Sequence, residues 1–123
     1  MSAFSQAELQ YLVSERHLAR VATVGKDGTP HVSPVGFSYN AELDTIDIGG
    51  RDNGATKKYR DVQRTGRAAV VIDDVLPPWQ PRGVEVRGRA EATGGAAPLI
   101  RIHPDRVVSW GLVEGPEEGT ITE

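Results

Sequence analysis

Apolar and polar residues alternate along much of this 123-residue chain, which is typical of strands with one buried face. This pattern predicts six strands, which we place at residues 18–24, 29–39, 45–49, 68–72, 83–92 and 99–112. The fourth differs from the others because it is a continuous apolar run between charged residues. It is therefore expected to be buried on both faces and to end at Asp73 and Asp74. The last is expected to break near Pro104.

Prolines limit where two of these segments can lie. Pro30 and Pro34 interrupt the second strand, and proline cannot donate to a strand ladder, so this strand is expected at a sheet edge. Its free side would lie around Ser33 and Pro34, where backbone groups can face a ligand or a partner. Three prolines and Trp79 in residues 76–82 predict an extended loop.

Two short helices complete the prediction. Ser5 and Glu8 have the spacing of a capping box, and the apolar residues that follow fit a helix to about residue 16. A second helix is expected to start near residue 55, after a glycine-rich turn, with Asn53 as its N-cap and to end near residue 65.

Six hairpin-connected strands and two short helices predict a mainly β fold, a small antiparallel split barrel. The whole chain, 1–123, is expected to form one domain, with residues 113–123 as a flexible acidic tail. So small a barrel fills its interior with its own side chains. A cofactor would therefore lie outside the barrel, in a groove between two subunits.

Composition excludes several classes of function. The net charge of −3 and the lack of a basic stripe with aromatic residues argue against nucleic-acid binding. The absence of cysteine excludes disulfides, thiolate metal sites and a cysteine nucleophile. The first ten residues do not resemble a signal peptide, and no run approaches the ~20 apolar residues of a membrane span. We therefore expect a soluble, cytoplasmic protein.

Positive charge gathers in one stretch, residues 51–67, which holds six basic and two acidic residues. Thr56, Lys57 and Lys58 stand at the predicted start of the second helix, where unpaired N–H groups and the helix dipole favour an anion. This favours a phosphate-binding corner. The alternative is a solvated amphipathic helix that packs Tyr59 and Val62 inward.

No catalytic group can be read from the sequence. His17, His31 and His103 lack the spacing of metal ligands, so no metal site is expected, and His31 is the histidine best placed to reach a substrate. Ser33 and Ser109 lack the context of a hydrolase nucleophile. The catalytic residues therefore stay unknown, which is compatible with a redox cofactor that carries the chemistry itself.

Several segments in order resemble the split-barrel flavin-binding proteins related to pyridoxamine 5'-phosphate oxidase. They are LARVATVGKDGTPHVSPVGFSYN, TIDIGGR, TKKYRDV, RAAVVIDD, PPWQPRGVEVRGRAE and IRIHPDRVVSWGL. Within that family they are most similar to the branch of deazaflavin-dependent oxidoreductases that use coenzyme F-420. The resemblance covers residues 4 to 112.

The resemblance implies a homodimer with each cofactor site at the subunit interface. The flavin-like ring would lie along the second strand, and the phosphate would meet the start of the second helix. A partner's loop would cover the cofactor, and the last strand would close the site. The implied cofactor-binding residues are Val32, Ser33, Pro34, Val35, Arg51, Asn53, Thr56, Lys57, Lys58, Trp79, Arg82 and Trp110.

The function implied is an F-420-dependent oxidoreductase that transfers a hydride between the cofactor and a small conjugated substrate. Arg51, Arg60 and Arg64 would accommodate the acidic oligoglutamate tail of F-420, which FMN lacks. The first alternative is an FMN-dependent oxidoreductase like pyridoxamine-phosphate oxidase. The second is a flavin-, deazaflavin- or haem-binding protein without turnover.

Overall fold

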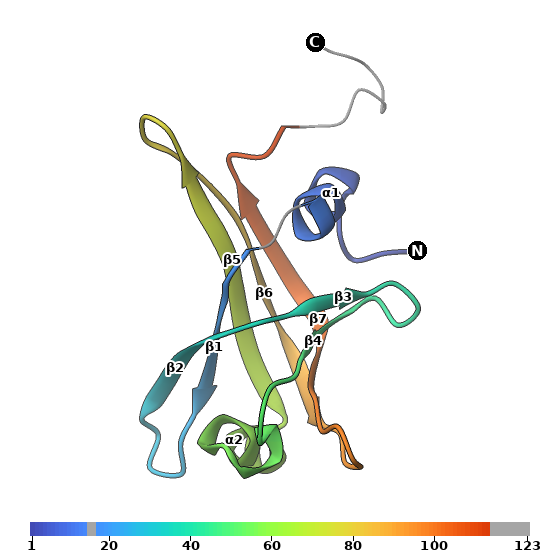
Figure 1. Cartoon of the computed structure of the whole chain (residues 1–123), viewed down its shortest axis with the longest axis vertical. Coiled ribbons are helices and arrows are strands. Elements are labelled where there is room, and N and C mark those ends of the chain that lie inside the picture. The colour runs from blue at the N-terminus through green and yellow to red at the C-terminus, as the bar shows by residue number, and fades with distance from the viewer. Residues whose placement is uncertain (15–16, 114–123) are drawn as a thin grey trace.

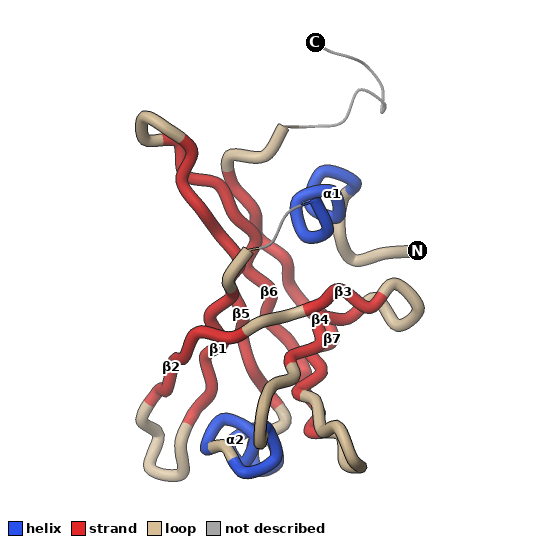
Figure 2. The backbone as a smooth tube through the Cα atoms, viewed as in Figure 1, coloured by secondary structure: helices blue, strands red, loops and turns tan. Residues whose placement is uncertain are grey.

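The computed structural model describes residues 1–14 and 17–113, and it contains one curled antiparallel sheet with helices at its ends (Figures 1 and 2). The strands lie in the order β2-β1-β5-β6-β7-β4-β3. The elements are α1 (Gln6–Ser14), β1 (Ala19–Val24), β2 (Pro30–Val35), β3 (Ser38–Asn40), β4 (Thr45–Ile48), the 3-10 helix η1 (Asn53–Ala55), α2 (Lys57–Thr65), β5 (Arg67–Leu76), β6 (Gln80–Ala92) and β7 (Ile100–Trp110). The predicted mainly β split barrel with two α-helices is confirmed.

The described residues form seven strands rather than the predicted six, because the segment 29–39 divides at Gly36 and Phe37. Its first part, β2, pairs with β1 at one edge of the sheet, and its second part, β3, pairs with β4 at the other. The segment therefore crosses from one edge strand to the other and brings the two edges of the sheet together (Figure 1). Alternation of side chains gives no sign of such a change of partner, so the sequence predicts one strand.

The edge position predicted from the prolines is confirmed. β2 is the first strand in the sheet order and pairs only with β1. Pro30 and Pro34 lie opposite Val24 and Arg20 and are exposed. Their missing N–H groups cost no ladder bond on the open side.

The predictions for the β5–β6 hairpin need correction. β5 is not buried on both faces: Ala68, Val70 and Ile72 are buried, whereas Ala69 and Val71 are half-buried on the outer face. The strand also continues past Asp73 and Asp74 to Leu76. Cross-strand ion pairs make this possible, since Asp73 meets Arg20 and Asp74 meets Arg82 at 2.8 Å each.

The extended loop predicted for 76–82 is a tight turn at residues 77–79 between two long strands. Pro81 is tolerated in β6 because the pairing of β6 with β7 begins only at Gly83. Before Gly83, residues 80–82 of β6 pair with β5 alone.

The predicted break near Pro104 is a β-bulge rather than an end of the strand. Arg87 pairs with Arg106 and Gly88 with Pro104, so Asp105 is the extra residue. Gly88 allows this approach, because a Cβ built on it would lie 1.9 Å from the carbonyl oxygen of His103. Only glycine fits there.

The barrel interior is filled by aliphatic side chains, as expected. Those with at most 1% exposure in the strands include Val21, Ile46, Ile48, Val70, Ile72, Val84, Val86, Ile100 and Ile102. α1 packs Tyr11 and Leu12 into the core cluster, and α2 closes the other end with Tyr59 and Val62 (Figure 1). A cofactor has no room inside this barrel.

Helix starts were predicted with mixed success. The capping box is confirmed, since Ser5 N donates to Glu8 Oε1 at 2.8 Å and Glu8 N donates to Ser5 Oγ at 3.1 Å. Asn53 as N-cap of the second helix is wrong. Thr56 caps α2, and its Oγ1 accepts from Tyr59 N, whereas Asn53 lies in η1.

No helix in residues 1–14 and 17–113 is long and apolar enough to span a membrane. The predicted acidic tail, 113–123, falls outside the described residues except for Val113. The first helix ends at Ser14, and residues 15 and 16 are also outside the described part.

Candidate functional site

The β1–β2 hairpin and the first turn of α2 meet around a surface hollow of about 380 Å³. It is lined by Lys26, Asp27, Thr29, His31 and Lys57. Within the described part of the chain, neither lysine forms an ion pair. The carboxylate of Asp27 accepts from Thr29 N at 3.0 Å. The hollow therefore presents two unpaired positive charges to solvent.

The start of α2 adds backbone donors beside these lysines. Thr56 has extended backbone and caps the helix, so the N–H groups of Lys57 and Lys58 begin the first turn without partners inside the helix. The Thr56 hydroxyl is itself engaged, because it donates to Asn53 O at 2.7 Å and accepts from Tyr59 N at 3.3 Å. An anion at this corner would meet N–H groups and ammonium groups first.

A buried carboxylate fixes the histidine of the hollow. His31 Nδ1 lies 2.8 Å from Asp61 Oδ2, and Thr23 Oγ1 donates to the same oxygen at 2.8 Å. Asp61 is 2% exposed. Burial by itself would raise the pKa of Asp61, but hydrogen bonds from His31 and Thr23 lower it below its usual value. Asp61 is thus an anion that holds the imidazole in one orientation.

The residues predicted to contact the ring alternate between the two faces of β2. Val32 is 70% exposed and Pro34 is exposed, and both point outward. Val35 is 8% exposed and belongs to the core cluster, so its side chain faces inward. A ring lying along this edge would contact the side chains of Val32 and Pro34. It would contact Ser33 and Val35 mainly through their backbone atoms.

Two further residues of the predicted phosphate corner differ in exposure. Arg51 is exposed in the turn after β4. Asn53 is 2% exposed, and its side-chain amide donates to Ile48 O at 3.3 Å and to Pro98 O at 2.9 Å. Asn53 therefore joins two loops beneath the corner.

The arginines expected to meet an acidic tail are partly engaged. Arg60 donates to Ala55 O at 2.9 Å, and Arg64 donates to Val24 O and lies 3.5 Å from Asp61. Arg51 has no ion pair in residues 1–14 and 17–113. It is the arginine of this set with the most freedom to meet a ligand.

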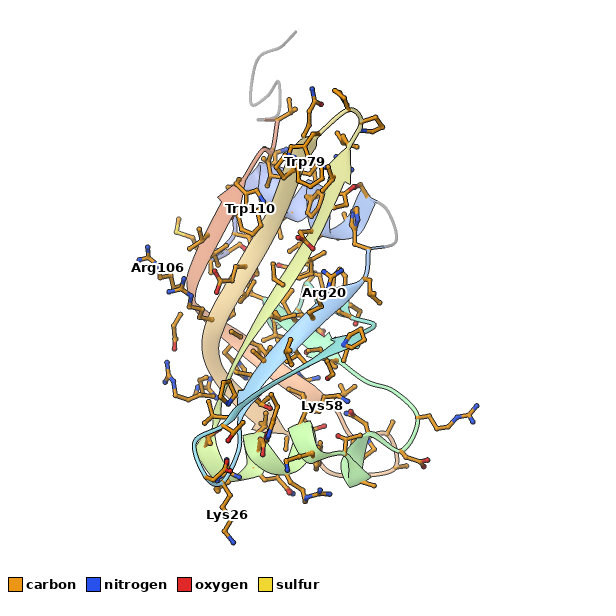
Figure 3. All side chains as sticks on the ribbon, turned by 90° about the vertical axis from the view of Figure 1, so that its left-hand side faces the viewer. Arg20, Lys26, Lys58, Trp79, Arg106 and Trp110 are labelled. Carbon is orange, nitrogen blue, oxygen red and sulfur yellow. The ribbon has the colours of Figure 1, made fainter. Side chains whose placement is uncertain are left out.

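The remaining predicted residues lie at the opposite end of the sheet. Figure 3 shows Lys26 and Lys58 at one end, and Trp79 and Trp110 at the other. Trp79 is 76% exposed at the tip of the β5–β6 hairpin, and Trp110 lies against Gly83 on β6. One chain alone does not bring the lysines and the tryptophans together.

Arg82 is part of a polar network at that tryptophan end. It forms two hydrogen bonds with Asp74, at 2.8 and 3.0 Å, and its guanidinium lies 5.0 Å from the centre of the Tyr11 ring. Tyr11 donates to Asp74 Oδ1 at 2.6 Å. Hydrogen bonds from Arg82 and Tyr11 lower the pKa of Asp74 to about 2. This network ties α1 to the β5–β6 hairpin close to its turn.

The sequence reveals only part of the hollow. It predicts a hairpin turn at Lys26 and the start of a strand at Thr29, and Asp61 enters only the charge balance of the second helix. The position of Asp61, between the inward residues Tyr59 and Val62, was the available sign that this carboxylate is buried. Its partner, His31, lies 30 positions earlier, so the pair could not be read from local spacing. No metal-binding group of three or more His, Cys, Asp or Glu side chains occurs among the described residues.

Comparison with known proteins gives consistent results. A family model described as pyridoxamine 5'-phosphate oxidase matches residues 5–110. A 5a,11a-dehydrotetracycline/5a,11a-dehydrooxytetracycline reductase of Streptomyces rimosus is 43% identical over 120 residues. That match covers 89% of this chain and 84% of the reductase.

Solved structures share the fold at lower identity. The FAD binding protein from Mycobacterium smegmatis has a TM-score of 0.67 and 24% identity, covering 89% of this chain and 93% of that protein. A structure described as an F420 reductase has a TM-score of 0.62 and 19% identity, covering 80% of this chain and 94% of that protein.

Proposed function

The chain belongs to the pyridoxamine 5'-phosphate oxidase family of split-barrel oxidoreductases, and from this premise we propose that it is a reductase dependent on the deazaflavin coenzyme F-420. It binds a flavin-type cofactor on the outside of the barrel. In this proposal a hydride passes between the deazaflavin and a small conjugated organic molecule.

Two relatives support this choice. The Streptomyces rimosus relative reduces a dehydrotetracycline, by its name, and such a molecule is small, polycyclic and conjugated. An F420 reductase shares the fold over nearly its whole length. A FAD binding protein has the same fold, so FMN or another flavin is the alternative cofactor.

The observation that carries the proposal is the cationic corner beside a free sheet edge. Lys57, Lys58 and the first N–H groups of α2 supply donors for a phosphate, at ~1.5–3 kcal/mol for each charge-assisted hydrogen bond. The outward residues of β2, Val32 and Pro34, supply an apolar edge for a ring. These residues fit the phosphate and the ring of a flavin or deazaflavin.

The cofactor, when bound, supplies the hydride chemistry, and the chain binds it, orients it and excludes water. The phosphate corner fixes one end of the ligand, while the edge of β2 limits the position of the other. No acid or base of this chain is assigned to the transfer.

Paired binding titrations test the choice of cofactor. Purified protein is titrated with F-420 and with FMN, and cofactor fluorescence is followed. We expect F-420 to bind at least about tenfold more tightly, because its acidic tail adds charges that Arg51 and the lysines can meet. Tighter binding of FMN would contradict the deazaflavin assignment and favour the FMN-dependent alternative.

Turnover needs a separate assay. Reduced F-420 with a panel of enones, quinones and dehydrotetracycline-like polycycles should be oxidised if the protein is a reductase. Tight cofactor binding with no oxidation across this panel would favour the alternative of a flavin-, deazaflavin- or haem-binding protein without turnover.

We further propose that the protein is a homodimer whose partner chain contributes the tryptophan end to each cofactor site. The outer face of the sheet supports this, because Val32 is 70% exposed and Ala22, Ala69 and Val71 line a shallow outer hollow with it. A second copy packed on this face would cover apolar surface that one chain leaves exposed.

A cytoplasmic location stays a prediction.

Sedimentation velocity tests the dimer. We expect twice the 13.3 kDa of one chain, and a shift to the single-chain mass in Val71→Asp, since a carboxylate would be buried in the apolar contact. In the folded monomer this charge lies between Arg20 of β1 and Glu85 of β6. Leu43→Asp, in the exposed β3–β4 turn, is the control that should stay dimeric. A wild-type protein of 13.3 kDa would contradict the proposal.

A further inference from the structure

His31 is the lining residue of the hollow whose chemistry the phosphate corner does not explain. Its side chain is 29% exposed, so the imidazole is partly accessible from solvent. One ring nitrogen, Nδ1, is held by Asp61. The other, Nε2, makes no hydrogen bond with any residue in 1–14 or 17–113, and His31 lines the hollow together with Lys26 and Lys57.

The surroundings of the imidazole are built to hold it. A Cβ on Gly25 would lie 2.4 Å from His31 Cε1, so the ring packs directly over the backbone of the hairpin turn. Asp61 is anchored in turn by Thr23 and lies near Arg64. A side chain held from two sides in this way has one orientation to offer a ligand.

The fixed contact with Asp61 decides what Nε2 can do. A carboxylate accepts a hydrogen bond, so Nδ1 carries a proton. A neutral imidazole then has a lone pair at Nε2, which an anion avoids. A protonated imidazole has an N–H there, which donates to an anion. A contact from Nε2 to an anion therefore requires the protonated imidazole.

Charged groups face His31 from each neighbouring element. Asp61 and Lys57 come from α2, and Lys26 and Asp27 come from the hairpin. Asp61 is paired with the imidazole, and the carboxylate of Asp27 is bound to Thr29 N. With His31 protonated, the two lysines and the imidazolium outnumber the one acid that lines the hollow.

We propose that the hollow is an oxyanion subsite in which His31, positioned by Asp61, donates from Nε2 to a phosphate or carboxylate oxygen. Lys26 and Lys57 supply the surrounding charge. Resting on the proposed function, the occupant is an oxyanion of the cofactor, either its phosphate or a carboxylate of its tail. Cofactor affinity then rises as the pH falls through the range in which histidine gains a proton.

The test compares F-420 with its chromophore lacking phosphate and tail, at about pH 5.5 and about pH 8.5. Any titration of the ring is common to both ligands and cancels in the ratio of their dissociation constants. We expect the advantage of F-420 to grow about tenfold at the lower pH in the wild type. In His31→Gln, which retains an amide donor but gains no charge, the advantage should not change with pH.

His103→Gln is the matched control. His103 Nε2 lies 2.7 Å from Glu91 on the β6–β7 ladder, so it is also a histidine paired with a carboxylate, but it does not line the hollow. This variant should retain the wild-type response. Asp61→Asn tests positioning, and we expect the pH-dependent advantage of F-420 to shrink because the imidazole is no longer fixed by a carboxylate, without loss of the fold in circular dichroism. A wild-type response in His31→Gln would overturn the proposal.

FMN distinguishes the two oxyanions, because it has a phosphate and no acidic tail. If His31→Gln abolishes the pH-dependent gain in affinity for FMN as well, a phosphate occupies the subsite. If the gain is abolished for F-420 only, a carboxylate of the tail occupies it. Both results support the subsite, and no loss with either ligand overturns it.

Failure of the proposed function is recognised separately. If neither deazaflavin nor FMN binds, inorganic phosphate is titrated while the imidazole NMR signals of His31 and His103 are followed. A shift of the His31 signal with His103 unchanged supports the subsite without any cofactor. No shift at about pH 5.5 overturns it.

Discussion

Replacing Gly88 with alanine is expected to lower the melting temperature by more than about 10 °C, through a loss of roughly 3 kcal/mol of folding free energy. The added methyl group would lie 1.9 Å from His103 O and 2.9 Å from Asp105 N. Both are backbone atoms of the bulge in β7, so no side chain can rotate away to make room. The central β6–β7 ladder would have to separate locally.

Thermal denaturation followed by circular dichroism measures this effect. Gly94→Ala is the control, because a Cβ there meets nothing within 4 Å in the exposed loop after β6. That variant should melt within a few degrees of the wild type. Equal melting temperatures for the two variants would show that the bulge relaxes at little cost.

Replacing Lys57 and Lys58 together with alanine is expected to weaken F-420 binding by at least tenfold, since two charge-assisted contacts worth ~1.5–3 kcal/mol each are lost. The Thr56 cap is unchanged, so α2 should still form. The loss should fall on affinity, and the melting temperature without cofactor should stay close to that of the wild type.

A matched control removes the same amount of charge elsewhere. Arg89 and Arg106 are exposed on β6 and β7 and have no ion pair among the described residues, so their double alanine variant lowers the net charge equally. If both double variants lose affinity to the same extent, the effect is one of overall charge and the phosphate corner is wrong. Unchanged affinity in the lysine variant would also contradict it.

The three sets of variants affect different parts of the molecule. The glycine variant concerns a backbone contact on which the fold depends. The lysine variant concerns the corner that binds the cofactor. The His31 variant concerns how strongly that corner binds at different pH, and the three need not fail together.

Much of the architecture follows from local sequence. Alternation along residues 83–92 predicted a strand with one exposed face, and β6 has that pattern. The spacing of Ser5 and Glu8 predicted a capping box, which forms through two backbone contacts. These features depend on residues a few positions apart, which is why the sequence is sufficient for them. The order of its segments likewise indicated the family.

Other features were decided by tertiary contacts. The division of residues 29–39 depends on which strand each half pairs with. Asn53 does not cap the second helix, because its side chain is hydrogen-bonded to Ile48 O and Pro98 O. Asp73 and Asp74 continue a strand because arginines from other strands face them. In each case the deciding partner is not given by the local pattern.

For the site, the sequence by itself determined the concentration of basic residues, the glycine-rich turn and the edge strand with its prolines. Only the tertiary structure decided that His31 meets Asp61 and that Lys26 joins Lys57 around one hollow. It also decided that Trp79 and Trp110 lie at the far end of the sheet (Figure 3). The physical reason is that charge density and strand periodicity are properties of neighbouring residues, whereas the hollow exists only where the barrel brings a hairpin against a helix.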